Sequence, residues 1–219
     1  MRTIKKVASH IFIDGFGGMT QGLFATLIIG TMIQQIGLLI GGSTGNVIYL
    51  LGKAAAALTS AGIGVGVAVK YGESPLVTVS AAVAAMVGGY AGKITGGTFF
   101  VDGNAVLAGP GEPLGAFIAA FAGITCGHLV SGKTKVDIIV TPVVTIGVGS
   151  VVGLLVGPPI SQMMTGLGSI INWATEQRPF IMGIVVSVVM GMVLTLPISS
   201  AALGIILNLS GLAAGAATI

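Results

Sequence analysis

Four side chains that could bind a polar solute lie in or near one break in an otherwise apolar chain. Asp102, Asn104 and Glu112 fall within the Gly- and Pro-rich segment 95–113, and His128 lies near the end of the next apolar stretch. A carboxylate accepts hydrogen bonds from hydroxyl groups and can relay protons, while a neutral imidazole can both donate and accept. These residues are therefore the candidate substrate-binding residues, with Glu112 ranked first.

Each candidate also has a simpler interpretation. Glu112 could be a loop carboxylate in bulk water, Asp102 and Asn104 could be plainly exposed, and His128 could lie at headgroup level. Depth decides between the two interpretations. In lipid, each unpaired backbone group of such a segment costs several kcal/mol. The segment must therefore leave the membrane or line a protected cavity within it.

Composition places the chain in the membrane. Hydrophobic residues make up 54% of the 219 residues, only 7% are charged, and the mean hydropathy is +1.06. A soluble domain carries about 25% charged residues. The net charge of +3 gives no indication of nucleic-acid binding, and the single Cys126 excludes a disulfide framework or a Cys-rich metal site. We expect an all-α polytopic membrane protein in a lipid bilayer, with no cofactor and no metal.

Apolar runs predict six or seven transmembrane helices. A spanning helix needs about 20 apolar residues. The last run could be a full span or the first arm of a hairpin. The predicted spans are Gly15–Ile40, Asn46–Val69, Pro75–Gly92, Leu114–Val130, Val136–Val156, Phe180–Leu196 and Ser199–Ile219.

The pattern changes in segment 158–178, where apolar residues recur at helical spacing among Ser, Gln, Thr and Asn. This favours an amphipathic helix at the membrane surface, with Trp173 as an interfacial anchor. Another span with one polar face would give the same pattern.

Lys and Arg predict the orientation. With Arg2, Lys5 and Lys6 in the cytoplasm, Lys70 and the pair Lys133 and Lys135 also fall on the cytoplasmic side. These assignments agree only if segment 95–113 does not cross the membrane as a full span. We therefore expect it to be re-entrant, or to begin and end on one side.

Two local motifs carry less information. Residues 127–134 match G-x-x-x-x-G-K-[ST], but a P-loop needs a preceding strand, and apolar spans flank this match. We interpret it as a cytoplasmic turn. Gly149, Gly153 and Gly157 are spaced by four, as are Gly62 and Gly66, which favours close helix packing, within the chain or in a dimer.

Three longer segments, Gly15–Thr31, Lys133–Pro142 and Gly191–Ala202, resemble the IIC-type membrane family of the bacterial phosphotransferase system, EIIC type 2. The resemblance covers the whole chain. It implies a homodimeric, multi-pass permease of the bacterial inner (plasma) membrane that binds and translocates a sugar for phosphorylation by a cytosolic IIB partner. It also implies re-entrant hairpins and a sugar-contacting Glu-Pro phrase. Glu112-Pro113 is similar to that phrase, although its neighbours differ.

Two departures keep other functions open. Members of that family continue beyond the phrase at Gly211–Ala217, so we expect this chain to lack the family's C-terminal third. The chain also carries no fused IIB or IIA domain, and Cys126 in an apolar run suits packing better than phosphoryl transfer. It would act as a membrane component without catalysing the reaction alone. The alternatives are a transporter of another small solute, or a non-transporting ligand-binding protein on the same scaffold.

Overall fold

The computed structural model describes residues 14–101, 104–107 and 109–175, together with 183–184, 187–188 and 191. The chain divides into two compact units, Met1–Pro158 and Pro159–Ile219. The candidate site and the pocket described below belong to the first unit. The predicted span Ser199–Ile219 and most of Phe180–Leu196 lie outside the described residues.

The first long helix runs through the predicted first span. It consists of α2 (Phe16–Leu23), a π-helical turn (Phe24–Ile28) and α3 (Ile29–Ile40), which together make one continuous apolar helix of 25 residues. It ends in a tight turn at Gly41 and Gly42, both with φ of 65°. Glycine reaches this left-handed region without a Cβ penalty, so the chain can reverse at once.

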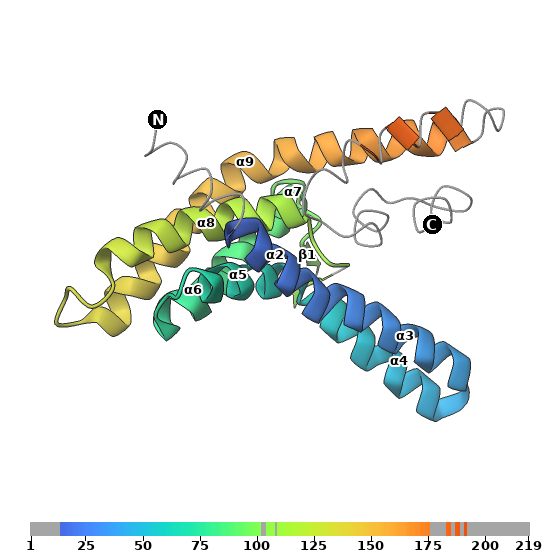
Figure 1. Cartoon of the computed structure of the whole chain (residues 1–219), viewed down its shortest axis with the longest axis horizontal. Coiled ribbons are helices and arrows are strands. Elements are labelled where there is room, and N and C mark those ends of the chain that lie inside the picture. The colour runs from blue at the N-terminus through green and yellow to red at the C-terminus, as the bar shows by residue number, and fades with distance from the viewer. Residues whose placement is uncertain are drawn as a thin grey trace. The chain divides into compact units, whose positions relative to one another are not determined.

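The returning helix is bent near its middle. It consists of α4 (Gly42–Ala57) and α5 (Thr59–Lys70), which meet at Leu58 at an angle of 53°. The predicted span Asn46–Val69 therefore forms a bent helix pair. In Figure 1, α3 and α4 lie side by side as a hairpin, and α5 packs beside α2.

The predicted break connects two antiparallel helices, α6 (Pro75–Gly89) and α8 (Pro113–Val130). Each helix begins with a capping side chain followed by proline. Ser74 accepts a hydrogen bond from the Val77 N–H, and Glu112 accepts from Leu114 and Gly115. Proline at the first helical position needs no N–H partner, so both starts are fixed by sequence. Between them lie α7 (Ala91–Thr95) and a two-stranded hairpin, β1 (Phe100–Val101) with β2 (Asn104–Ala105).

The fifth predicted span is the start of a much longer helix. α9 runs without interruption over Asp137–Thr175, through Pro142, Pro158 and Pro159. The part of segment 158–178 that the structure describes therefore continues this helix. Trp173 is exposed on it. Residues 176–178 are not described.

Glycines bring the helices of the first unit into backbone contact. A Cβ on Gly18 would lie 2.6 Å from the Gly66 carbonyl oxygen and 2.7 Å from the Val67 Cα, and a Cβ on Gly22 would meet the Gly62 backbone. The pair Gly62 and Gly66 thus packs against α2 in the same chain. The Gly149, Gly153 and Gly157 series likewise packs within the chain, against backbone or side-chain atoms of α6, α7 and α8.

The structure confirms an all-α polytopic membrane fold. Three described helices are long and apolar enough to cross a bilayer, or four if the bent pair counts as one span, and α6 is a shorter apolar helix. In the described part of the chain, one two-stranded antiparallel hairpin accompanies these helices.

Candidate functional site

The last residues of segment 95–113 are held against the bend between α4 and α5. The Ser60 hydroxyl donates to the Pro110 carbonyl at 3.0 Å, and the Glu112 N–H donates to the Gly89 carbonyl at 2.7 Å. The Tyr90 hydroxyl, which is almost fully buried, contacts the Gly109 carbonyl. These bonds fix the irregular backbone to the ends of two helices.

The backbone carbonyls left without helical partners at the bend contact side chains of the same region. A helix that stops leaves its last carbonyls without intrahelical partners. Here the Thr59 hydroxyl donates to the Ala56 carbonyl at 2.6 Å, and the Tyr90 hydroxyl lies 3.3 Å from the Ala57 carbonyl. The bend and the break therefore share one buried cluster of polar groups, centred on Tyr90 and Ser60.

Glu112 acts as the N-cap of α8. Its Oε1 accepts from the Leu114 N–H at 3.1 Å, and its Oε2 accepts from the Gly115 N–H at 2.5 Å. This is a structural role that the sequence interpretation did not include. Each carboxylate oxygen has a second lone-pair site. The cap therefore leaves Glu112 able to accept a hydrogen bond from a ligand.

The other candidates of the break are farther from this cluster or not described. Asn104 is exposed in β2, where it is the strand partner of Val101 in β1. Asp102 lies outside the described residues.

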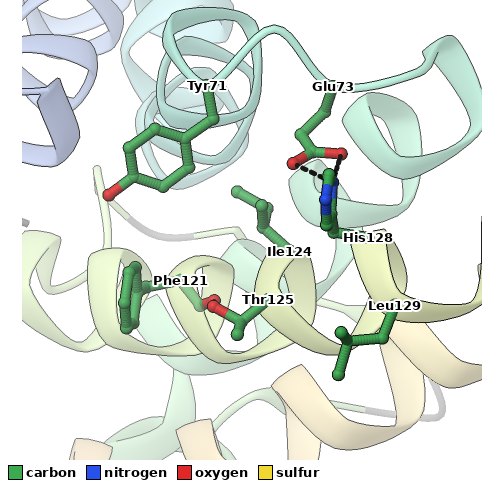
Figure 2. Close-up of a pocket in the computed structure, with 7 residues that line it drawn as sticks. All are labelled: Tyr71, Glu73, Phe121, Ile124, Thr125, His128 and Leu129. Carbon is green, nitrogen blue, oxygen red and sulfur yellow. Dashed lines mark hydrogen bonds and ion pairs between the residues drawn. The ribbon is translucent and has the colours of Figure 1, made fainter. Parts of the chain in front are cut away.

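His128 lies at the other end of α8, in a pocket of about 410 Å³. Its Nδ1 is 3.0 Å from one oxygen of Glu73 and 3.2 Å from the other. Figure 2 shows Glu73 reaching down from the turn after α5 to meet His128 on α8. The lining residues are Tyr71, Glu73, Phe121, Ile124, Thr125, His128 and Leu129.

The turns that carry the lysines meet at this end. The Ser74 and Ser131 hydroxyls are 3.0 Å apart and join the turn after α5 to the turn after α8. Burial, with a smaller effect of the Asp14 carboxylate, raises the pKa of Tyr71 to about 12, so the start of α2 lies near the same turn. Lys70, Lys133 and the start of α2 therefore share one end, here called the lysine end. Which membrane face this end occupies stays a prediction.

The structure does not bring Glu112 and His128 into one site. Glu112 and His128 stand at opposite ends of α8, and 16 residues of helix separate them by about 24 Å. One monosaccharide cannot touch both. The match to a phosphate-binding loop also falls at the lysine end, where Gly127 lies inside α8 and no strand precedes it. The structure thus agrees with its interpretation as a turn between helices.

Four residues of the two polar clusters escaped the sequence interpretation: Ser60, Tyr71, Glu73 and Tyr90. Glu73 follows Lys70 in a turn and looks like a solvated loop residue, yet its side chain is only 9% exposed. Ser60 and Tyr90 lie in apolar runs, where small polar and aromatic residues are common. Their partners are 50 and 19 residues away, so no local signal could reveal them.

Fold and polar clusters together define a multi-pass helical membrane protein with irregular backbone held between its helices. A family model described as "Phosphotransferase system, EIIC" matches residues 13–219. The chain belongs to this family of phosphotransferase-system membrane subunits. No curated protein and no solved structure matches it significantly.

Proposed function

We propose that the chain is a IIC permease subunit that binds and translocates a sugar for uptake through the phosphotransferase system. The observation that carries this proposal is the match of the EIIC family model to residues 13–219. The polar cluster at the break supplies a plausible place for the substrate. Glu112, with Asp102 and Asn104 in the same segment, is the proposed first contact for sugar hydroxyls.

Helix lengths support an intramembrane position for this cluster. From Lys70 at the lysine end to the bend at Leu58, α5 rises about 18 Å, and α6 rises about 22 Å to Gly89. The hydrocarbon core of a bilayer is about 30 Å thick. If the lysine end lies at one membrane surface, Glu112 lies below the opposite surface. A re-entrant segment 95–113 follows from this placement.

Placement of residues 109–112 at that depth is chemically acceptable because the carbonyls of Gly109 and Pro110 and the N–H of Glu112 have partners. Irregular backbone occurs inside membranes where protein buries it or where it lines a water-filled cavity. Ser60 and Tyr90 donate to the carbonyls of Pro110 and Gly109. The remaining capacity of the Glu112 carboxylate is then available to a hydroxylated solute.

The partners and the location belong to the same proposal. We infer a cytosolic IIB partner, a homodimer and a bacterial inner membrane with the N-terminus in the cytoplasm from the family and the lysine positions. The glycine series on α9 gives no support to the dimer, because it packs within the chain. Chemical cross-linking in native membranes measures the oligomer directly.

A binding experiment on Glu112 tests the site. The chain is purified, reconstituted in proteoliposomes and assayed for binding and uptake of a panel of labelled sugars. Glu112→Gln keeps one carbonyl oxygen that can cap α8 but removes the charge and the second acceptor oxygen, so we expect sugar affinity to fall and thermal stability to drop by no more than one cap hydrogen bond, about 1 kcal/mol. Thr98→Ala, in the same segment but exposed, is the matched control.

The outcomes separate the functions. A sugar that binds with equal affinity to the parent and to Glu112→Gln would remove Glu112 from the site but keep the permease. Flux of an ion or organic acid with no response to any sugar would favour a transporter of another solute. Ligand binding without flux would favour a non-transporting protein.

Topology has its own test. Cys126→Ser gives a chain without thiols, into which single cysteines are placed at Lys70 and Lys133. We expect a membrane-impermeant maleimide to label both positions from the same side, the cytoplasmic face. Labelling from opposite sides would contradict the arrangement of the lysine end.

A further inference from the structure

The pocket at the lysine end is not used by the site at the break. It lies between the turn after α5 and the last two turns of α8 (Figure 2). We propose that this pocket is a second binding site, for an uncharged hydroxyl-rich ligand such as a sugar or polyol. The identification of the ligand class rests on the proposed function. The position of the site rests on geometry alone.

One wall of the pocket is an oriented imidazole. Contacts of 3.0 and 3.2 Å to the Glu73 carboxylate require the proton on Nδ1 of His128. Glu73 is 9% exposed and His128 is 71% exposed, so the buried carboxylate fixes a ring that remains open to solvent. In the neutral ring, Nε2 then accepts a hydrogen bond. In the charged ring it donates one.

The opposite wall is aromatic and aliphatic. The rings of Tyr71 and Phe121 stand edge to face with centroids 6.3 Å apart, and Ile124 and Leu129 complete the apolar lining. Thr125 donates its hydroxyl proton to the Phe121 carbonyl at 2.7 Å. Its oxygen therefore faces a ligand as an acceptor. The pocket combines apolar surface for the C–H face of a sugar ring with polar atoms along one side.

Charge selects among ligand classes. The Glu73 carboxylate opposes an anion, so a phosphate or a carboxylate is disfavoured. A cation would have to compete with the His128 N–H for the Glu73 carboxylate, whose side chain is only 9% exposed. Burial raises the pKa of Tyr71 to about 12, so its hydroxyl is neutral near pH 7. An uncharged ligand whose hydroxyls both donate and accept satisfies these groups best, and about 410 Å³ lies within the range of small-ligand pockets.

Two sites at opposite ends of α8 would act in succession. A sugar at Glu112 lies about 24 Å from the His128 pocket, which is the length of the helix between them. With the lysine end in the cytoplasm, a translocated sugar would bind this pocket last, before it leaves the protein on the cytoplasmic side. The exposed His128 ring would then be accessible to a soluble partner.

The experiment measures equilibrium binding of the full chain in nanodiscs to labelled D-glucose, D-mannitol and N-acetyl-D-glucosamine. We expect His128→Gln and Phe121→Leu to weaken the affinity roughly fivefold, as the loss of one hydrogen bond or of ring contact would. Lys135→Gln is the matched control, since Lys135 is exposed and lies outside the lining. Thermal stability of each variant is measured alongside.

A labelling experiment keeps the test independent of folding defects. In the Cys126→Ser background, Leu129→Cys introduces a thiol at the exposed edge of the pocket lining and leaves His128 in place. A bound sugar should slow its reaction with maleimide, whereas inorganic phosphate and choline should not. Protection by phosphate or choline in place of sugar would overturn the ligand class.

The two proposals fail separately. If a sugar binds, Glu112→Gln weakens it, and neither His128→Gln nor Phe121→Leu has an effect, the second site is wrong and the permease stands. If no sugar in the panel binds the parent chain or protects the thiol, both are overturned.

Discussion

Replacing Gly18 by alanine should separate α2 from α5. The added methyl carbon would lie 2.6 Å from the Gly66 carbonyl oxygen, 2.7 Å from the Val67 Cα and 2.9 Å from the Gly66 carbonyl carbon. All three atoms are backbone, so no side chain can rotate away. Ordinary carbon–oxygen contact begins near 3.4 Å, so the helices must move apart by roughly 0.8 Å, and overpacking of this kind costs about 1–3 kcal/mol.

Gly17→Ala is the matched control, one residue along the same helix. Its Cβ would meet only the Lys70 side chain, at 3.9 Å, which is ordinary contact. Alanine is also favoured over glycine in a helix by up to about 1 kcal/mol, so this variant should be neutral or slightly more stable.

The assay is thermal unfolding in detergent, followed by size-exclusion chromatography after heating. For a chain of this length, 1 kcal/mol corresponds to about 2–4 °C in Tm. Gly18→Ala should therefore lower the apparent Tm by roughly 2–12 °C, while Gly17→Ala leaves it unchanged or raises it. Equal melting of both variants would refute the backbone contact between α2 and α5.

Three further predictions concern the polar contacts. Gly111 has φ of 76°, and a Cβ there would collide with the Ser60 hydroxyl, so Gly111→Ala should lower Tm. Adding Ser60→Ala should recover only part of the lost Tm, because the left-handed backbone of Gly111→Ala still costs about 1–2 kcal/mol. Tyr90→Phe removes the donor that contacts the Gly109 carbonyl and should cost about 1–3 kcal/mol with faster amide exchange around Gly111; unchanged exchange would contradict the clamp. Ser74→Ala and Ser131→Ala share one bond of 3.0 Å, so the double variant should lose less Tm than the sum of the single variants. Strict additivity would argue against that bond.

Helix positions were largely predictable because bilayer thickness imposes long apolar runs. The predicted span Leu114–Val130 differs from α8 by one residue, and Gly15–Ile40 starts one residue before the long first helix. In each case the boundary is a local signal: Glu-Pro opens α8, and two adjacent glycines end α3. Such signals do not depend on the rest of the fold.

The bend at Leu58 had no such signal. Residues 54–57 are four alanines, which favour a straight helix, and no proline is near. At the bend, the Thr59 hydroxyl donates to the Ala56 carbonyl, and the Tyr90 hydroxyl oxygen lies 3.3 Å from the Ala57 carbonyl oxygen. Tyr90 comes from the junction of α6 and α7, so the angle is a tertiary property.

The continuity of α9 was unpredictable for a related reason. Pro158 and Pro159 favour a helix end in water, because proline removes a donor and restricts the residue before it. Within a membrane, other groups can satisfy the freed carbonyls, and helices tolerate proline. The change in polarity near residue 158 does coincide with the boundary between the two compact units.

The candidate site was only partly predictable, because some of its features depend on residue type alone and others on contacts between residues far apart in sequence. Glu112 and His128 could be recognised because a carboxylate and an imidazole are rare in an apolar chain. Their partners could not, because Glu73 lies 55 residues from His128. The separation of the two candidates did follow from sequence once α8 was assigned, as both lie on one straight helix.

The same lengths explain why polar backbone sits between these helices at all. α5 and α6 extend about 18 and 22 Å from the lysine end, less than a hydrocarbon core of about 30 Å. If the lysine end lies at one membrane surface, as proposed, the chain stops being regular before it has crossed, at a level where unpaired groups are costly. Tyr90 and Ser60 satisfy carbonyls there, and the Glu112 carboxylate covers two N–H groups at the start of α8. On the proposed placement, Glu112 combines this structural role as the N-cap of α8 with an ionisable acceptor below the membrane surface, where a hydroxylated solute crossing the membrane would need one.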